Sequence, residues 1–162
     1  RGIYRINISK DNKNYTTRLF TQKDGLPSTL ENYVFKIKNK VVFATSKGIY
    51  EFNKDSGKFI PSGFLSPVFH DMVVRYLRED KDGNIWFCSG KKIGVAIYNS
   101  ADKANPYSIT YFPELTGQIL SGFENIYPYN KENIFIASEK GVIHLNYVRY
   151  AANKLQIKVL LN

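Results

Sequence analysis

Hydrophobic positions along this chain fall in short runs that are separated by polar turns. The stretch Lys81–Asn99 (KDGNIWFCSGKKIGVAIYN) shows the pattern most clearly, because a polar turn precedes the apolar run Ile85–Ser89 and an alternating run closes on Asn99. A continuous apolar run predicts a strand buried on both faces, and alternation predicts a strand with one buried face. No segment has the periodicity of a helix, so the pattern predicts an all-β fold.

The end of this stretch recurs through the chain. The four copies are GIYRIN, GIYEFN, GVAIYN and GVIHLN, which begin at Gly2, Gly48, Gly94 and Gly141 and are therefore 46, 46 and 47 residues apart. A near-constant period of this size indicates one supersecondary unit that is stacked on copies of itself.

Each unit is predicted to be a four-stranded antiparallel meander with tight hairpins and a long link to the next unit. Four short strands in a period of this length are typical of a β-propeller blade. We therefore predict that the chain, 1–162, is one partial β-propeller. Its expected parts are the two last strands of an earlier blade (1–20) and three blades (33–60, 73–112 and 125–161).

The last blade and the open ends of the ring leave alternatives. Leu155–Leu161 (LQIKVLL) is predicted to be the fourth strand of the last blade, but it could instead begin a different domain. An incomplete ring exposes apolar faces and unpaired strand edges. We therefore expect either further blades outside this chain or self-association of copies through edges or faces.

Composition supports a globular β protein. Hydrophobic residues make up 43% of the chain and aromatic residues 15%, with 12 Tyr and 11 Phe, which suit pleated surfaces. No apolar run approaches the roughly 18 residues that a membrane helix needs. Since the chain starts inside a repeat and without Met, we expect a piece of a longer protein, with any membrane or targeting segment in its flanks.

The net charge of +9 raises the question of a polyanionic partner. The 23 Lys and Arg residues are scattered, and the only adjacent pair is Lys91-Lys92. No basic helix, zinc-ligand spacing or RNA-binding signature accompanies them. A generally basic surface is the simpler interpretation, and we do not expect nucleic acid as a partner.

One family resemblance rests on these repeats. Asp80–Ser89 (D-x-x-G-N-I-W-F-x-S) followed by Gly94–Asn99 (G-V-x-x-Y-N) resembles the two-component regulator propeller repeat. The link Asp24–Ser28 (DGLPS) is similar to the link before the first strand of such blades, and GVIHLN resembles the last blade before a triple-tyrosine domain. The repeats depart from the family pattern because only one of them contains its Trp, Trp86.

The resemblance implies a function and a location. Such propellers are extracytoplasmic sensor regions of Bacteroidetes-type regulators, often hybrid histidine kinases that respond to oligosaccharides, and some are joined to DNA-binding output. It implies a periplasmic, ligand-sensing segment of an inner-membrane protein. The alternative is a non-catalytic scaffold for protein interaction or dimerisation.

Two conspicuous residues are predicted to be structural. Trp86 lies inside the buried run, where a large aromatic side chain anchors one blade on another. Cys88 aligns with Ala44 and Ala137 of the other repeats, so a small core residue is expected rather than a nucleophile.

Catalytic and metal sites find little support. Asp80–Asn84 (DKDGN) could suggest calcium, but Ile85 and Lys91 occupy the positions where an EF-hand loop needs Gly and Glu. A hairpin turn is expected there. His70-Asp71 is the only neighbouring pair that could serve a propeller glycan hydrolase or lyase. We predict no catalytic residue, no metal and no cofactor.

Ligand contacts are expected on the face formed by the long links and the turns between the second and third strands, because loops on a rigid scaffold carry function. Aromatic, amide and charged groups gather there in a mixture that suits a sugar, although they could simply cap the blades. The candidate ligand-binding residues are Asn32, Tyr33, Phe69, His70, Asp71, Arg75, Lys91, Lys92, Asn125 and Tyr127.

Overall fold

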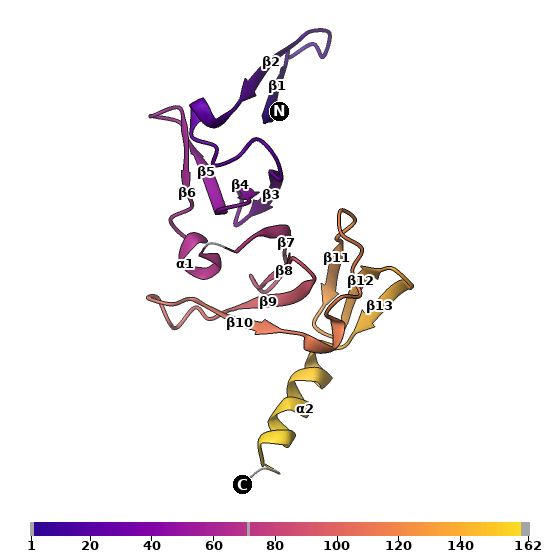
Figure 1. Cartoon of the computed structure of the whole chain (residues 1–162). Helices are drawn as coiled ribbons and strands as arrows, with labels where there is room; N and C mark the ends of the chain where they lie inside the picture. Colours follow the sequence, from indigo (N-terminus) through magenta and orange to yellow (C-terminus); the bar gives the residue numbers. More distant parts are fainter. Residues whose placement is uncertain (1, 71, 160–162) are drawn as a thin grey trace. The chain divides into compact units, whose positions relative to one another are not determined.

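The protein is built from antiparallel β-sheets. A computed structural model describes residues 2–70 and 72–159, and the chain divides into two compact units, Arg1–Arg75 and Tyr76–Asn162 (Figure 1). The sheets contain two, four, four and three strands. The all-β prediction is thus confirmed at the level of secondary structure. Among the described residues, no helix is both long enough and apolar enough to cross a bilayer.

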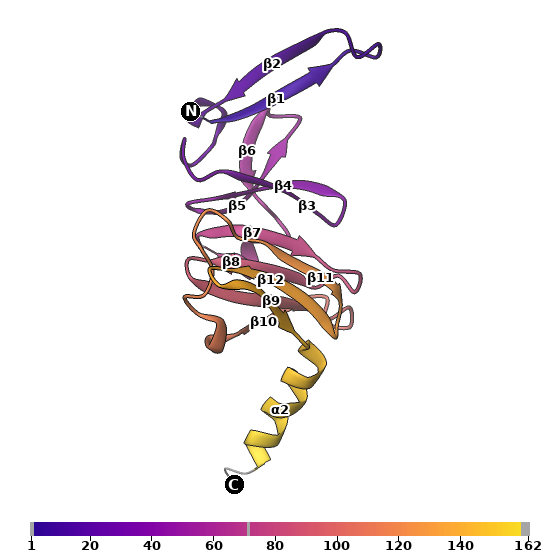
Figure 2. The ribbon, with the colours of Figure 1, turned by 90° about the vertical axis from the view of Figure 1, so that its right-hand side faces the viewer.

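Unit 1 contains a hairpin and a four-stranded sheet, both drawn in Figure 2. The hairpin is β1–β2, and the sheet has the order β3-β4-β5-β6. The elements are β1 (Ile3–Ile8), β2 (Tyr15–Phe20), the 3-10 turn η1 (Gln22–Asp24), β3 (Tyr33–Ile37), β4 (Lys40–Thr45), β5 (Gly48–Asn53), β6 (Lys58–Pro61) and the short helix α1 (Ser66–Phe69).

Lys38 and Asn39 form the turn between β3 and β4. Lys38 and Asn39 both have positive φ, 47° and 61°, and Ile37 pairs with Lys40. Two consecutive residues of positive φ form the turn that matches the twist of a two-residue hairpin. Lys40 consequently belongs to β4.

Aromatic rings form the core of unit 1. Phe20 at the end of β2 packs against Phe52 and Phe59, with ring centroids 5.1 and 5.4 Å apart. Phe43 of β4 meets Phe59 edge-on at 4.8 Å. Such edge-to-face pairs are favoured over face-to-face stacks. The hairpin β1–β2 is thus attached to the sheet through one of its two faces.

Unit 2 contains two sheets and a helix. β7 begins just before the unit boundary and completes a sheet of order β10-β9-β8-β7, and the second sheet has the order β11-β12-β13. The elements are β7 (Val74–Glu79), β8 (Ile85–Ser89), β9 (Lys92–Tyr98), β10 (Tyr107–Tyr111), the 3-10 turn η2 (Pro113–Leu115), β11 (Ile126–Asn130), β12 (Asn133–Ser138), β13 (Gly141–Leu145) and α2 (Tyr147–Val159).

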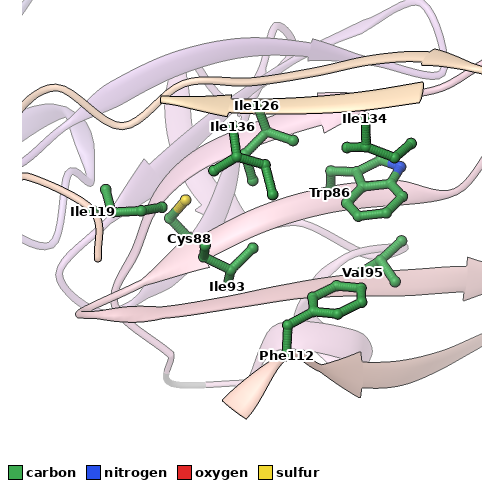
Figure 3. Packing of buried hydrophobic residues seen from close by; sticks show 9 residues of the cluster. All are labelled: Trp86, Cys88, Ile93, Val95, Phe112, Ile119, Ile126, Ile134 and Ile136. Atoms are coloured by element: carbon green, nitrogen blue, oxygen red, sulfur yellow. The ribbon is translucent and has the colours of Figure 1, made fainter. Parts of the chain in front are cut away.

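The core of unit 2 lies between these two sheets (Figure 3). Trp86 and Cys88 of β8 belong to a buried cluster with Ile134 and Ile136 of β12. Trp86 stacks on Phe112 with ring centroids 5.7 Å apart. The predictions that Trp86 and Cys88 are core residues are confirmed, since they are 1% and 0% exposed.

The segment after β13 contradicts the sequence prediction. Residues 147–159 form helix α2, so the fourth strand expected at Leu155–Leu161 is wrong as far as Val159, and residues 160–162 lie outside the described part. Asn146 starts the helix, because its side chain accepts a hydrogen bond from the Arg149 amide at 3.0 Å. The pair Ala151-Ala152 favours the helix, and the apolar alternation that suggested a strand lies at its end.

Candidate functional site

The turn between β7 and β8 is organised by one side chain. Asp80 Oδ1 accepts hydrogen bonds from the amides of Asp82 and Asn84, at 3.0 and 2.9 Å, and Oδ2 accepts from Asn84 Nδ2 at 2.9 Å. Gly83 supplies a φ of 82°, which few other residues adopt without strain. The expected hairpin turn is confirmed, and it presents Lys81 and Asp82 to solvent.

The turn between β11 and β12 uses the same device. Asn130 Oδ1 accepts from the amides of Glu132 and Asn133, at 3.0 and 2.9 Å. Asn and Asp favour turns because their side chains bond to amides two or three residues further along. Lys131 at the tip lies 3.5 Å from Asp82 Oδ2, so an ion pair joins the two turns.

A cavity of about 470 Å³ lies beside these two turns, and we call it the turn pocket. Its volume falls within the range of small-molecule sites, roughly 300–1,000 Å³. Tyr129 supplies an aromatic ring that is half-exposed, and Lys81 Nζ lies 5.7 Å from the centre of that ring. The lining residues are Asp80, Lys81, Asp82, Pro128, Tyr129, Asn130, Lys131, Glu132 and Val148 of α2.

The turn pocket suits a neutral, hydroxyl-rich ligand. Its two positive residues, Lys81 and Lys131, face three carboxylates, Asp80, Asp82 and Glu132, so the lining carries a formal charge of −1 and disfavours an anion. A ring such as that of Tyr129 can cover an apolar C–H face, while carboxylates accept from hydroxyl groups and ammonium groups donate to them. Asp80 is largely committed to the turn, which leaves Asp82 and Glu132 as the acceptors.

A second cavity, of about 350 Å³, lies in unit 1. Lys40 and Glu51 face each other there with 3.7 Å between Nζ and Oε2, and Lys40 Nζ is 5.0 Å from the centre of the Phe64 ring. Its lining has one lysine and one carboxylate, which pair with each other, whereas the turn pocket has two lysines and three carboxylates. The lining residues are Lys40, Glu51, Phe52, Asn53, Ile60, Pro61, Gly63 and Phe64.

Within unit 1, the predicted site residues do not gather in one place. Arg75 binds Glu31 through a 2.8 Å ion pair, and Asn32 Nδ2 donates to the Ser28 carbonyl at 3.0 Å. Tyr33 is partly buried in β3, opposite Ala44. These contacts organise the link before β3.

Phe69 and His70, both predicted to bind a ligand, lie in different environments. Phe69 is fully buried at the end of α1, so its ring is a core residue and not part of a ligand surface. The helix turns the apolar Phe69 inward, which the sequence could not show because a loop was expected there. His70 is exposed, and Asp71 lies outside the described residues.

Within unit 2, the predicted residues do not line the turn pocket. Tyr127 packs under Arg78, whose guanidinium carbon is 5.8 Å from the ring centre, and its own ring centre is 6.4 Å from that of Tyr129. Asn125 Oδ1 accepts from the Tyr76 hydroxyl at 3.3 Å.

The two lysines of unit 2 lie at the turn between β8 and β9. Lys91 and Lys92 are both exposed, and Lys92 Nζ is 5.8 Å from the centre of the Tyr111 ring. Together with Gly90 they lengthen this hairpin, since β9 begins at Lys92, two residues before the repeat glycine. They remain a predicted contact site.

Sequence reasoning therefore missed the turn pocket, because it expected ligands at the links and at the turns between second and third strands. The pocket is formed instead by turns between first and second strands. The available signal was Tyr129, an aromatic residue directly before a polar turn (Asn130-Lys131).

The buried thiol is no part of a reactive site. Burial raises the pKa of Cys88 to about 12, with a smaller contribution from the Glu124 carboxylate. A nucleophilic cysteine needs the thiolate, which this environment disfavours. Across the described residues, no group of three or more His, Cys, Asp or Glu side chains could hold a metal ion.

Comparisons with known proteins support the fold. No protein-family model matches the chain, and no curated protein matches it. It is similar to the crystal structure of the extracellular domain of a one-component system, BT4673, from B. thetaiotaomicron, with 15% sequence identity and a TM-score of 0.51. The match covers 80% of this chain and 17% of that chain. At this identity the similarity describes the fold.

Proposed function

We propose that the chain is a segment of a sensory β-propeller that binds an oligosaccharide outside the cytoplasm, as part of a two-component-type regulator. The observation that carries the proposal is that all four copies of the repeat ending become equivalent strands. β5, β9 and β13 each follow the strand with the buried apolar run, and β1 is the matching strand of the hairpin. Such regular recurrence is the signature of stacked blades.

Two further points favour a sensor over other propeller functions. The structural neighbour is an extracellular domain of a one-component system, which favours a place outside the cytoplasm, in the periplasm, with any membrane anchor in flanking segments. The single cysteine is buried and its thiol pKa is raised, so it is a poor nucleophile. We therefore assign binding rather than catalysis to this segment.

The turn pocket is the site that we assign to the ligand. It combines the half-exposed Tyr129 ring with carboxylate, amide and ammonium groups, in a cavity large enough for a short saccharide. A neutral oligosaccharide fits its slightly negative lining better than an acidic one. The exposed lysines at the β8–β9 turn, Lys91 and Lys92, are a second candidate contact.

Isothermal titration calorimetry tests the proposal directly. The whole chain is titrated with a panel of neutral oligosaccharides, and with acidic oligosaccharides as the contrasting class. We expect heat of binding with at least one neutral member, and Tyr129→Ala should weaken that binding about tenfold, or about 1.4 kcal/mol. Phe123→Ala, which removes an exposed ring outside the pocket, is the matched control and should leave the affinity unchanged.

The outcomes separate the two parts of the proposal. Absence of heat with every oligosaccharide contradicts the ligand assignment. If Tyr129→Ala leaves the binding unchanged while Phe123→Ala or Lys91→Ala weakens it, the sensor function is retained. The ligand site is then on the face expected from the sequence.

A further inference from the structure

One side of the hairpin β1–β2 brings two arginines together. Arg5 of β1 and Arg18 of β2 are directly opposite each other in the antiparallel ladder, so their side chains leave the hairpin on the same side. Both guanidinium groups lie against the ring of Phe20, with Cζ atoms 5.6 and 4.6 Å from its centre. Cation–π contacts with one ring therefore hold two like charges in the same region.

This side of the hairpin already has its neighbouring sheet in the chain. Ile3 and Phe20 are the next opposed residues on the same side, and both pack in the cluster that contains Phe52 of β5. Arg5 is nevertheless exposed, and the Arg18 side chain is 51% exposed. The two arginines thus lie at the solvent-exposed edge of a contact whose two halves both belong to unit 1.

Little negative charge surrounds these arginines. Arg18 donates through one nitrogen to Asp24 Oδ1 at 3.2 Å, and among the described residues this is the only ion pair that either arginine makes. Asp24 Oδ2 serves the turn η1, because it accepts from the Thr21 amide at 2.9 Å. The pKa of Asp24 is lowered by that amide and, to a lesser extent, by Arg18 and Lys58. Three positive groups therefore share one carboxylate.

The arrangement is suited to an anion that contacts both arginines. Like charges directly opposite each other on neighbouring strands are destabilising, and a bound anion between them removes that repulsion. Each guanidinium carries five N–H donors in a planar fork, and Asp24 occupies only one nitrogen of Arg18. A phosphate or sulfate group can present two oxygens to each fork, whereas a carboxylate has a single edge of two oxygens.

We propose that Arg5 and Arg18 bind a tetrahedral oxyanion, the phosphate or sulfate group of a ligand, on this side of the hairpin. Asn7 and Thr16 are the next opposed residues on the same side and extend the site with an amide and a hydroxyl, which are joined by a 3.4 Å hydrogen bond. The site shares no residue with the turn pocket, since its residues belong to unit 1. The inference does not rest on the proposed function.

NMR titration of the isotopically labelled whole chain tests this site. Sodium sulfate, sodium phosphate and sodium acetate are compared at constant ionic strength, with sodium chloride as the background, because salt screens exposed charges. The amide signals of Arg5, Arg18 and Phe20 should shift saturably with sulfate and with phosphate. Acetate should bind about tenfold more weakly, since it can fill only one fork. The tetrahedral ion that binds more tightly identifies the group that the site prefers.

Two substitutions and a matched control locate the binding. Arg5→Gln should weaken sulfate binding about tenfold, because one fork is lost. Arg5→Lys keeps the charge without the fork and should also weaken it. Arg78→Gln is the control, because Arg78 is another exposed arginine, with Cζ 5.8 Å from the centre of the Tyr127 ring. It makes the same change in net charge and should leave the affinity unchanged.

Each contrary outcome overturns the proposal. These outcomes are the absence of a saturable shift with both tetrahedral ions, equal losses in Arg5→Gln and Arg78→Gln, native affinity in Arg5→Lys, and acetate that binds as tightly as sulfate. Circular dichroism checks that the variants are folded, and Arg18→Gln replaces Arg5→Gln if that variant is not.

Discussion

The indole nitrogen of Trp86 donates a hydrogen bond of 3.1 Å to Asp80 Oδ2. Trp86 is buried, so water cannot replace this acceptor. The same carboxylate holds the β7–β8 turn through three further hydrogen bonds from Asp82 and Asn84. One side chain therefore connects the turn that borders the turn pocket with the core of unit 2.

Asp80→Ala should lower the free energy of unfolding by about 2 kcal/mol, since it leaves a buried donor without an acceptor and releases the turn. Denaturant unfolding followed by Trp86 fluorescence measures this, because Trp86 is the only tryptophan. Asp82→Ala is the matched control, and removing its exposed ion pair with Lys131 should cost about 0.5 kcal/mol or less. Equal losses in the two variants would contradict the assigned role of Asp80.

Cys88 makes the stability depend on alkaline pH. Its pKa is raised from 9.0 in the unfolded chain to about 12 in the folded protein. Between these values the unfolded state loses a proton that the native state keeps, so stability falls as the pH rises. Unfolding free energies measured from pH 8 upward should decline less steeply for Cys88→Ala than for the native chain.

The alanine variant is a fair comparison because Ala44 and Ala137 occupy the equivalent positions of the other repeats. Parallel pH profiles of the two proteins would show that the thiol titrates alike in both states. Alkylation gives a second readout, since Cys88 should react with iodoacetamide only after unfolding.

Much of the fold follows from the sequence for a clear physical reason. Alternating and continuous apolar runs bounded by turn residues such as Asp80–Asn84 specify strands locally, so β8 and β12 lie where the pattern places them. Helix α2 could not be obtained this way. It depends on capping by Asn146 and on contacts of Tyr147 and Tyr150 with Phe112, whose ring centres are 6.2 and 4.9 Å from theirs.

The candidate site was less predictable, because a pocket is a property of two elements and not of one. Tyr129 and Lys81 are 48 positions apart in the sequence, and no local pattern brings them together. Phe69 was expected in a loop, but it is fully buried because helix α1 turns its ring inward. Residue types alone could not assign either environment.

Gly94 is required for steric reasons. A Cβ added there would lie 2.5 Å from Cζ of Phe87 and 3.0 Å from the Thr110 carbonyl oxygen. Phe87 is buried and opposite Gly94 in the β8–β9 ladder, so its ring cannot move aside easily. Gly94→Ala should lower the melting temperature, with a cost of about 1–3 kcal/mol from overpacking.

Gly63→Ala is the matched control for this prediction, because no atom lies within 4 Å of the added Cβ and the backbone of Gly63 is not left-handed. It should leave the melting temperature almost unchanged. If both alanine variants melt alike, the packing of Phe87 over Gly94 does not limit stability.

His70 holds a strained backbone, with φ of 40° and ψ of −126°. Its amide donates a hydrogen bond of 2.7 Å to the Ser66 carbonyl oxygen. Its own carbonyl oxygen would lie only 2.4 Å from a Cβ added at Gly48. Such a conformation costs a residue other than glycine about 1–3 kcal/mol. His70→Gly should therefore stabilise the protein by about 1 kcal/mol, after the entropy that glycine adds to the unfolded chain is subtracted.

Asn12→Gly tests the same change at a φ of 58°, which Asn tolerates, and should give no gain. Thermal unfolding of the two variants decides the question, and a loss of stability in His70→Gly would show that the imidazole contributes contacts that outweigh the backbone strain.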